Sequence, residues 1–159
     1  LEQMGYQAES GPWRNFYLTG AKELREGVKK LPVPDTASPD TVRAMTLDML
    51  FDYFGVRLNR EKAAGKHVVL NLDFTDTNQK YTLEMVNSVL NHTEGKPAKE
   101  PTASLTLTRD TLNRMMLKET NLKDAIAKGD VKVTGDQQQI TDMFAALDNF
   151  EFWWNIVTP

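Results

Sequence analysis

Hydrophobic and polar positions are most regularly ordered between residues 103 and 147. Apolar and polar side chains alternate first, which is typical of a half-buried strand. Helical spacing of apolar residues follows, and Gly129 is the usual kind of residue at which a chain leaves a helix. The predicted elements are a strand at 103–108, a helix from 110 or 111, a helix at 122–128, a strand at 131–133 and a helix at 136–147.

The preceding stretch predicts one long helix and three strands. Ser38 is a suitable N-cap and Pro39 a suitable first residue for an apolar-striped helix that should end at Gly55. The whole pattern predicts an α+β fold, with a mainly antiparallel sheet of about five strands and helices packed on one face around an apolar core or pocket. The strands predicted in this stretch are 67–74, 81–85 and 89–92.

Apolar residues also gather near both ends of the chain. Residues 1–31 suggest the end of a helix, a turn at Gly11-Pro12, a group of aromatic residues and a polar helix at 21–30. We expect these aromatic side chains to stay partly exposed, because their partner surface belongs to absent domains. Residues 150–154 favour an extended segment that folds back onto the main domain. The alternative is that both ends pack together as one satellite cluster.

Composition narrows the classes of function. The chain has 159 residues, a net charge of -3 and a pI near 5.4, which argue against a dedicated nucleic-acid binder. No apolar run approaches the roughly 20 residues of a transmembrane helix, so we do not expect a membrane-spanning protein. The chain begins at Leu1 without a signal-peptide pattern, and we interpret it as a piece of a longer protein or a processed product.

Residues suited to catalysis are sparse. The absence of cysteine excludes disulfides, thiolate catalysis and cysteine zinc sites, but it leaves the cellular compartment open. The 2 histidines, His67 and His92, lack the spacing of a binuclear zinc site. Asp73 and Asp76 lie near a strand end and are interpreted as solvated or turn-forming carboxylates. We therefore expect no catalytic residue, metal or cofactor in this chain.

The apolar interior remains as the candidate site. The chain contains 7 methionines, most of them on predicted inward or half-inward faces. Thioether side chains either fill irregular gaps in a core or line a deformable pocket for an alkyl chain, and both interpretations stay open. The candidate pocket residues are Met45, Met49, Tyr53, Leu70, Leu72, Leu83, Met85, Met115, Met116, Met143 and Phe144.

The block from about residue 34 to residue 147 resembles the sterol-carrier-protein type-2 fold. The matching features are the first amphipathic helix, the hairpin YTLEMVNSVL at 81–90, the strand and helix ASLTLTRDTLNRMM at 103–116, and above all KGDVKVTGD at 128–136. The last segment matches the family pattern of two glycines around a valine strand. The hairpin departs from the family at Asn87-Ser88, where many relatives have a glycine.

The two ends of the chain resemble the alkyl sulfatases, in LEQMGYQAESGPWRNFYLTGAKELREG at 1–27 and FEFWWNIVTP at 150–159. The resemblance implies that residues 1–31 are the end of a helical dimerisation domain with a connector, and that residues 32–159 are a sterol-carrier-like domain. It also implies a preceding metallo-β-lactamase-type catalytic domain that holds zinc. The parent would then be a bacterial, homodimeric hydrolase of long-chain alkyl sulfates, with a periplasmic or secreted location preferred to a cytoplasmic one.

Two hypotheses of function follow from this resemblance. In the first, the chain is a non-catalytic C-terminal module that binds or delivers the alkyl chain of the substrate or a lipid. In the second, it is a structural module without a ligand, which stabilises the multidomain enzyme or its dimer. The expected partners are a long-chain ligand and the catalytic and dimerisation domains, and not nucleic acid.

Overall fold

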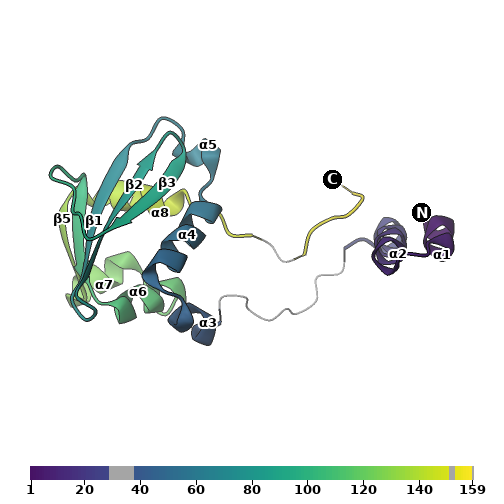
Figure 1. Ribbon diagram of the computed structural model, residues 1–159, viewed down its shortest axis with the longest axis horizontal. Helices are drawn as coiled ribbons and strands as arrows, with labels where there is room; N and C mark the ends of the chain where they lie inside the picture. The colour runs from purple at the N-terminus through teal and green to yellow at the C-terminus, as the bar shows by residue number, and fades with distance from the viewer. Residues whose placement is uncertain (29–37, 151–152, 159) are drawn as a thin grey trace. The chain divides into compact units, whose positions relative to one another are not determined.

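The computed structural model describes residues 1–28, 38–150 and 153–158 (Figure 1). Contacts divide the chain into two compact units, one of Leu1–Pro34 with Phe150–Pro159 and one of Asp35–Asn149. They are named here the terminal unit and the sheet unit. The division into domains at residue 31 stays a prediction.

The described residues of the sheet unit form a five-stranded sheet. Its strands are β1 (Val68–Phe74), β2 (Gln79–Val86), β3 (Val89–Glu94), β4 (Ala103–Leu107) and β5 (Val131–Gly135). Their order is β3-β2-β1-β4-β5, in which only the β1–β4 pair is parallel. The α+β class and the mainly antiparallel sheet are thereby confirmed.

Short helices pack against this sheet, and one prediction about them is wrong. The expected helix from Pro39 to Gly55 is two helices, because Met45 is extended with φ -66° and ψ 138°. The hydroxyl of Thr46 accepts a hydrogen bond from the N–H of Met49 at 3.2 Å and so starts a new helix. The helices of this unit in the described residues are α3 (Pro39–Ala44), α4 (Leu47–Arg57), α5 (Arg60–Ala63), α6 (Arg109–Met116), α7 (Leu122–Lys128) and α8 (Gln137–Ala145).

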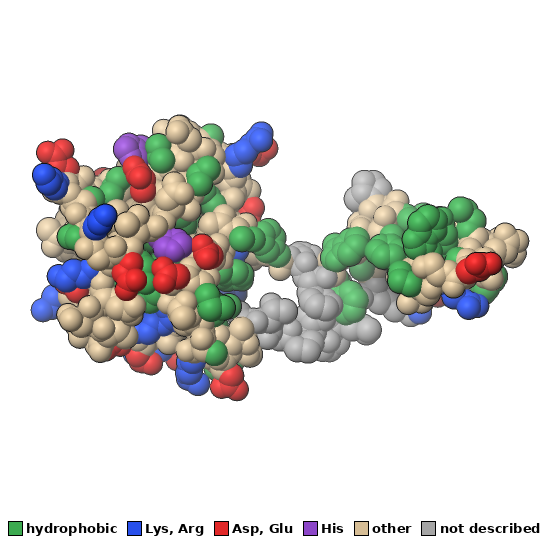
Figure 2. Space-filling view, in the orientation of Figure 1, with side chains coloured by type: hydrophobic (Ala, Val, Ile, Leu, Met, Phe, Trp, Pro, Cys, Tyr) green, Lys and Arg blue, Asp and Glu red, His purple; other side chains and the backbone are tan. Residues whose placement is uncertain are grey.

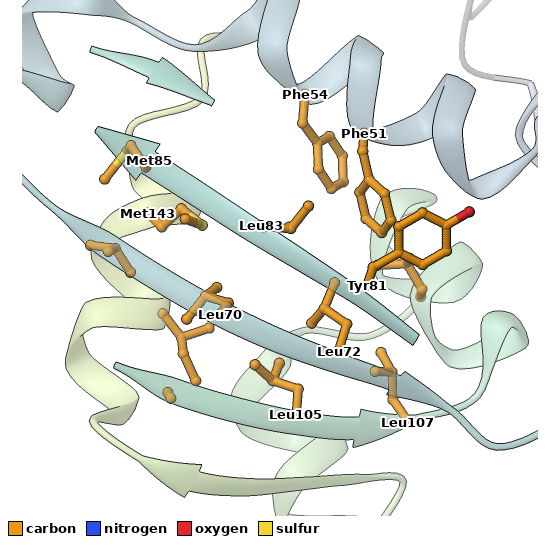
Figure 3. Close-up of a cluster of buried hydrophobic side chains, with 14 of the residues drawn as sticks. Phe51, Phe54, Leu70, Leu72, Tyr81, Leu83, Met85, Leu105, Leu107 and Met143 are labelled. Atoms are coloured by element: carbon orange, nitrogen blue, oxygen red, sulfur yellow. The ribbon is translucent and has the colours of Figure 1, made fainter. Parts of the chain in front are cut away.

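The core lies between the helices and one face of the sheet. Every second residue of β1, from Val68 to Phe74, is buried, and the residues between them are half-buried. Figure 3 shows the rings of Phe51 and Phe54 pointing from α4 toward this face. The centroids of Phe51 and Tyr81 are 5.0 Å apart, an edge-to-face contact. Helices packed on one face of the sheet were predicted and are confirmed.

The opposite face of the sheet is polar and carries the loop between β3 and β4. Asn71 both donates to the carbonyl of Ala98 and accepts from its N–H, each at 2.9 Å. Thr82 donates to the carbonyl of Lys96 at 2.8 Å. These bonds satisfy loop backbone groups that would otherwise need water.

Positive φ values and a close approach of the backbone explain the residues at two turns of the sheet. Asn87 and Ser88 have φ values of 52° and 60°, so the predicted hairpin is formed without a glycine. Gly135 has a φ of 97°, and a Cβ added there would lie 2.6 Å from the carbonyl oxygen of Thr102. The glycine after the β5 valines is therefore required by both conformation and space.

The terminal unit consists of α1 (Glu2–Gln7), α2 (Gly11–Glu26) and the C-terminal tail, whose described residues are 150 and 153–158. α2 differs from the predicted helix at 21–30, because it begins at Gly11 and includes the aromatic residues. Proline suits the first helical turn, where its missing N–H has no helical partner anyway, so Pro12 starts the helix instead of preventing it.

The predicted position of the C-terminal tail is also wrong. The tail was expected to fold back onto the main domain, but it belongs to the terminal unit. The reason is a side chain of α2: the carboxylate of Glu23 accepts hydrogen bonds from the N–H groups of Ile156, at 2.7 Å, and Thr158, at 2.9 Å. The alternative prediction, in which both ends of the chain pack together, is the one that the structure supports.

Candidate apolar ligand site

Five of the predicted pocket residues lie inside the core of the sheet unit. Strand alternation directs four of them to the helix-covered face, and the fifth projects from α8 (Figure 3). All five are 5% exposed or less. They are Leu70, Leu72, Leu83, Met85 and Met143.

Five others form a half-buried rim around this core. Their apolar atoms contact the core, while part of each side chain remains accessible. The Phe144 ring meets the Phe54 ring edge-to-face at 5.9 Å, and the guanidinium of Arg57 lies 5.3 Å from the centre of the Tyr53 ring. The rim residues are Met45, Tyr53, Met115, Met116 and Phe144.

Met49 does not belong with the predicted pocket residues. It is 54% exposed, whereas Leu50 and Phe51 next to it are buried. The cap at Thr46 fixes where α4 begins, and it therefore sets which side of the helix faces the sheet. The predicted single helix contained no such restart, so the inward placement of Met49 was wrong.

The sequence-based list also omitted the aromatic centre of the core. Phe51 lies 6.1 Å from Phe54, 6.4 Å from Phe74 and 5.0 Å from Tyr81, measured between ring centroids. The spacing of Leu47, Phe51 and Phe54 along one helix was a usable signal. The predicted pocket residues were chosen mainly for methionine, the adaptable side chain, and they did not include these rings.

Polar groups border the aromatic end of the core. The Tyr81 hydroxyl donates to Oδ2 of Asp48 at 3.3 Å, and Nε2 of His92 lies 3.3 Å from Oδ1 of the same carboxylate. Burial, together with the negative charge of Asp48, raises the pKa of Tyr81 to about 12. The hydroxyl therefore stays protonated at neutral pH and serves as a hydrogen-bond donor.

Arg109 joins two helices beside the rim. Its Nη2 donates to the carbonyls of Val42, at 3.1 Å, and Met45, at 3.0 Å, and its backbone N–H donates to Asp76. Burial lowers the pKa of the Arg109 guanidinium, and the charge of Asp76 opposes that effect. The side chain thus holds the end of α3, and with it Met45, against α6.

A hollow of about 450 Å³ opens elsewhere on the sheet unit. Threonine hydroxyls line it together with charges of both signs, among them Arg114, Asp130 and Lys132. None of the predicted pocket residues lines this hollow. It is a polar surface feature and not the apolar site that was predicted.

The described residues were compared with the requirements of a metal site and of a membrane-spanning helix. Within them, no group of three or more His, Asp or Glu side chains is placed to hold a metal ion. None of their helices is both long enough and apolar enough to span a bilayer. The fold and its interior define an α+β module with an apolar core and a half-buried methionine rim.

Two family profiles match the chain. The profile described as alkyl sulfatase C-terminal covers residues 35–159, and the profile described as alkyl sulfatase dimerisation covers residues 1–27. The chain belongs to the alkyl sulfatase family, as the C-terminal region with the end of the dimerisation region. The predicted membership of the alkyl sulfatases is confirmed.

Two alkylsulfatases of Pseudomonas sp. support this placement. A linear primary-alkylsulfatase of Pseudomonas sp. is 65% identical over 100% of this chain and 24% of its own length. The structure of a stereoselective inverting sec-alkylsulfatase from Pseudomonas sp. has 37% identity and a TM-score of 0.77, over 94% of this chain and 23% of that one. Sterol carrier protein 2 from Yarrowia lipolytica, in its apo form, has 19% identity and a TM-score of 0.48, over 64% of this chain and 91% of that one. The chain spans about a quarter of the length of the alkylsulfatases that it matches.

Proposed function

We propose that the sheet unit binds the alkyl chain of an alkyl sulfate, or a similar lipid chain, as an accessory module of an alkyl sulfatase. The observation that carries the proposal is the half-buried rim of Met45, Met115 and Met116 around a continuous apolar core. Unbranched thioether side chains change rotamer at low cost, so a rim of this kind can open around an apolar chain.

Burial of the alkyl chain would supply the free energy of such binding. Each methylene transferred from water to an apolar interior contributes about 0.8 kcal/mol. A twelve-carbon tail could therefore supply several kcal/mol before the costs of association are subtracted. Recognition of a charged head group is not needed for this binding.

The chemistry would take place in another part of the longer protein. We place the hydrolysis of the sulfate ester in a zinc-dependent metallo-β-lactamase-type domain, for which this chain supplies no catalytic residue. The terminal unit would contribute to a homodimer, in line with the dimerisation profile that matches residues 1–27. Its exposed aromatic residues, Trp13 and Phe16, suit such a contact.

A second candidate function is purely structural. Leu70, Leu83 and Met85 are 0% exposed, and side chains thus already occupy the centre of the unit. In this alternative the core is permanently filled, and the sheet unit stabilises the multidomain enzyme without a ligand.

A displacement assay separates the two candidates. A fluorescent fatty acid is bound to the full chain and displaced with dodecanol, which is not a denaturing detergent. Met116→Trp fills the rim and should weaken binding about tenfold, equal to about 1.4 kcal/mol. Met49→Trp is the matched control, because Met49 is 54% exposed and should leave the affinity unchanged. Absence of saturable binding to the folded wild-type chain would favour the structural alternative.

A further inference from the structure

Glu23 is a charged residue in an unusual position. Its side chain lies in the last turns of α2 and the residue is only 6% exposed. Burial penalises a carboxylate, and the negative end of a helix dipole is an unfavourable place for it. Such a group persists only where strong donors replace the lost water.

The C-terminal tail supplies those donors. The N–H groups of Ile156, Val157 and Thr158 donate to the Glu23 carboxylate at 2.7, 3.2 and 2.9 Å, and the Thr158 hydroxyl donates to it as well. Consecutive N–H groups directed at one anion form a backbone nest. The Thr158 hydroxyl and the backbone donors hold the pKa of Glu23 at about 2, so the carboxylate is ionised at neutral pH.

The surface of α2 is shaped to receive the tail. Gly20 lies about one helical turn before Glu23, and a Cβ added to it would come within 3.0 Å of Cγ1 of Val157. Ala21, beside it, is 6% exposed. Small side chains at these positions allow the tail backbone to approach the helix closely enough for the carboxylate bonds.

We propose that residues 153–158 are a clasp, which the Glu23 carboxylate holds against α2. The terminal unit thus contains chain segments that precede and follow the sheet unit in the sequence. The last residues of the chain then function with the dimerisation helix, although the C-terminal family profile includes them.

Near-isosteric variants of the full chain test the clasp. Glu23→Gln replaces one acceptor oxygen with an NH₂ group that must face the tail donors. Thr158→Val removes the hydroxyl bond and leaves the three backbone bonds in place. Glu9→Gln is the control, since it makes the same charge change at an exposed position of the same unit.

The measurement is amide hydrogen exchange of residues 156–158 by NMR at near-neutral pH. In the wild type these amides should exchange at least about tenfold more slowly than in a free peptide. Glu23→Gln should abolish this protection, Thr158→Val should reduce it, and Glu9→Gln and the β1 amides should show no change. If Glu23→Gln does not fold, Thr158→Val decides. Unprotected amides in the wild type, or full protection in both Glu23→Gln and Thr158→Val, would overturn the proposal.

Discussion

The two units of this chain distribute apolar and charged groups in opposite ways. The sheet unit encloses most of its large apolar residues, with Phe51 and Phe54 at 1% and 2% exposure. The terminal unit buries the carboxylate of Glu23 and exposes Trp13 at 66% and Phe16 at 56%. Hydrophobic side chains cover much of the visible face of the terminal unit, whereas they are interspersed with charges on the sheet unit (Figure 2).

This difference shows which unit has a hydrophobic core of its own. A module that buries its own apolar residues has the main source of folding free energy within itself. A unit that exposes aromatic residues and depends on a carboxylate clasp is suited to further contacts. We therefore expect the sheet unit to respond to substitutions as an independent domain does, and the terminal unit to respond mainly through association and through its tail.

The largest effect is expected in the aromatic core. Phe51→Ala removes a ring that contacts Phe54, Phe74 and Tyr81, and it should lower the free energy of unfolding by about 3–5 kcal/mol. Trp13→Ala removes an exposed ring of the terminal unit and should change it by less than about 0.5 kcal/mol. Urea denaturation followed by far-UV circular dichroism measures both. Equal losses in the two variants would remove the distinction between the units.

A smaller loss is expected where the sheet turns toward α8. Gly135→Ala places a Cβ 2.6 Å from the Thr102 carbonyl at a φ of 97°, and should cost about 2–3 kcal/mol. Gly129 has a similar φ of 81° but open space around its Cα, so Gly129→Ala should cost about 1 kcal/mol. Thermal unfolding of the two variants separates the steric contribution from the conformational one. A loss in Gly135→Ala no larger than in Gly129→Ala would show that the close approach is unimportant.

A still smaller loss of stability is expected at the break between α3 and α4. Thr46→Ala removes the hydroxyl that caps the Met49 N–H and should lower the free energy of unfolding by about 1 kcal/mol. Thr46→Asp keeps a capping oxygen and should restore most of the loss. Chemical denaturation compares the three proteins, and an unchanged stability in Thr46→Ala would mean that other contacts determine the break.

The smallest expected effect is local and depends on pH. The pKa of Glu23 is lowered from 4.5 to about 2 in the folded chain. Because this pKa is depressed, the ionised carboxylate stabilises the clasp fully above pH 4.5. The stabilisation is lost as the pH falls toward 2. Amide exchange of residues 156–158, corrected for its intrinsic pH dependence, should therefore show release of the tail in this window. A similar transition in Glu23→Gln would assign the release to another group.

Local pattern was enough to predict much of the sheet unit. The alternation in 67–74 and 103–108 reports directly which face of a strand is buried, and Gly129 ends α7 as predicted. The break at Thr46 was missed because a threonine inside an apolar stripe reads as an ordinary helical residue. Only the hydrogen bond of its hydroxyl to the Met49 N–H, and the bonds from Arg109 to the end of α3, distinguish a broken helix from a continuous one.

The misplacement of Met49 at the candidate site has the same origin. Met49 was placed inward because the phase of α4 depends on where the helix begins, and that position was missed.

The clasp could not be predicted from local pattern. It joins Glu23 to residues that follow it by 133 to 135 positions. No periodicity within a segment reports a contact of this kind, since each partner has an ordinary local sequence.

If an alkyl chain enters the apolar interior of the sheet unit, the 7 methionines of the chain should report its binding. Their methyl groups are labelled with ¹³C and observed by NMR while dodecanol is added to the full chain. We predict saturable shifts with one shared dissociation constant for the core and rim methionines, and no shift for Met4 and Met49, which are 51% and 54% exposed. The responsive group is Met45, Met85, Met115, Met116 and Met143. Unchanged core and rim signals, or shifts confined to Met4 and Met49, would contradict binding of an alkyl chain inside the sheet unit.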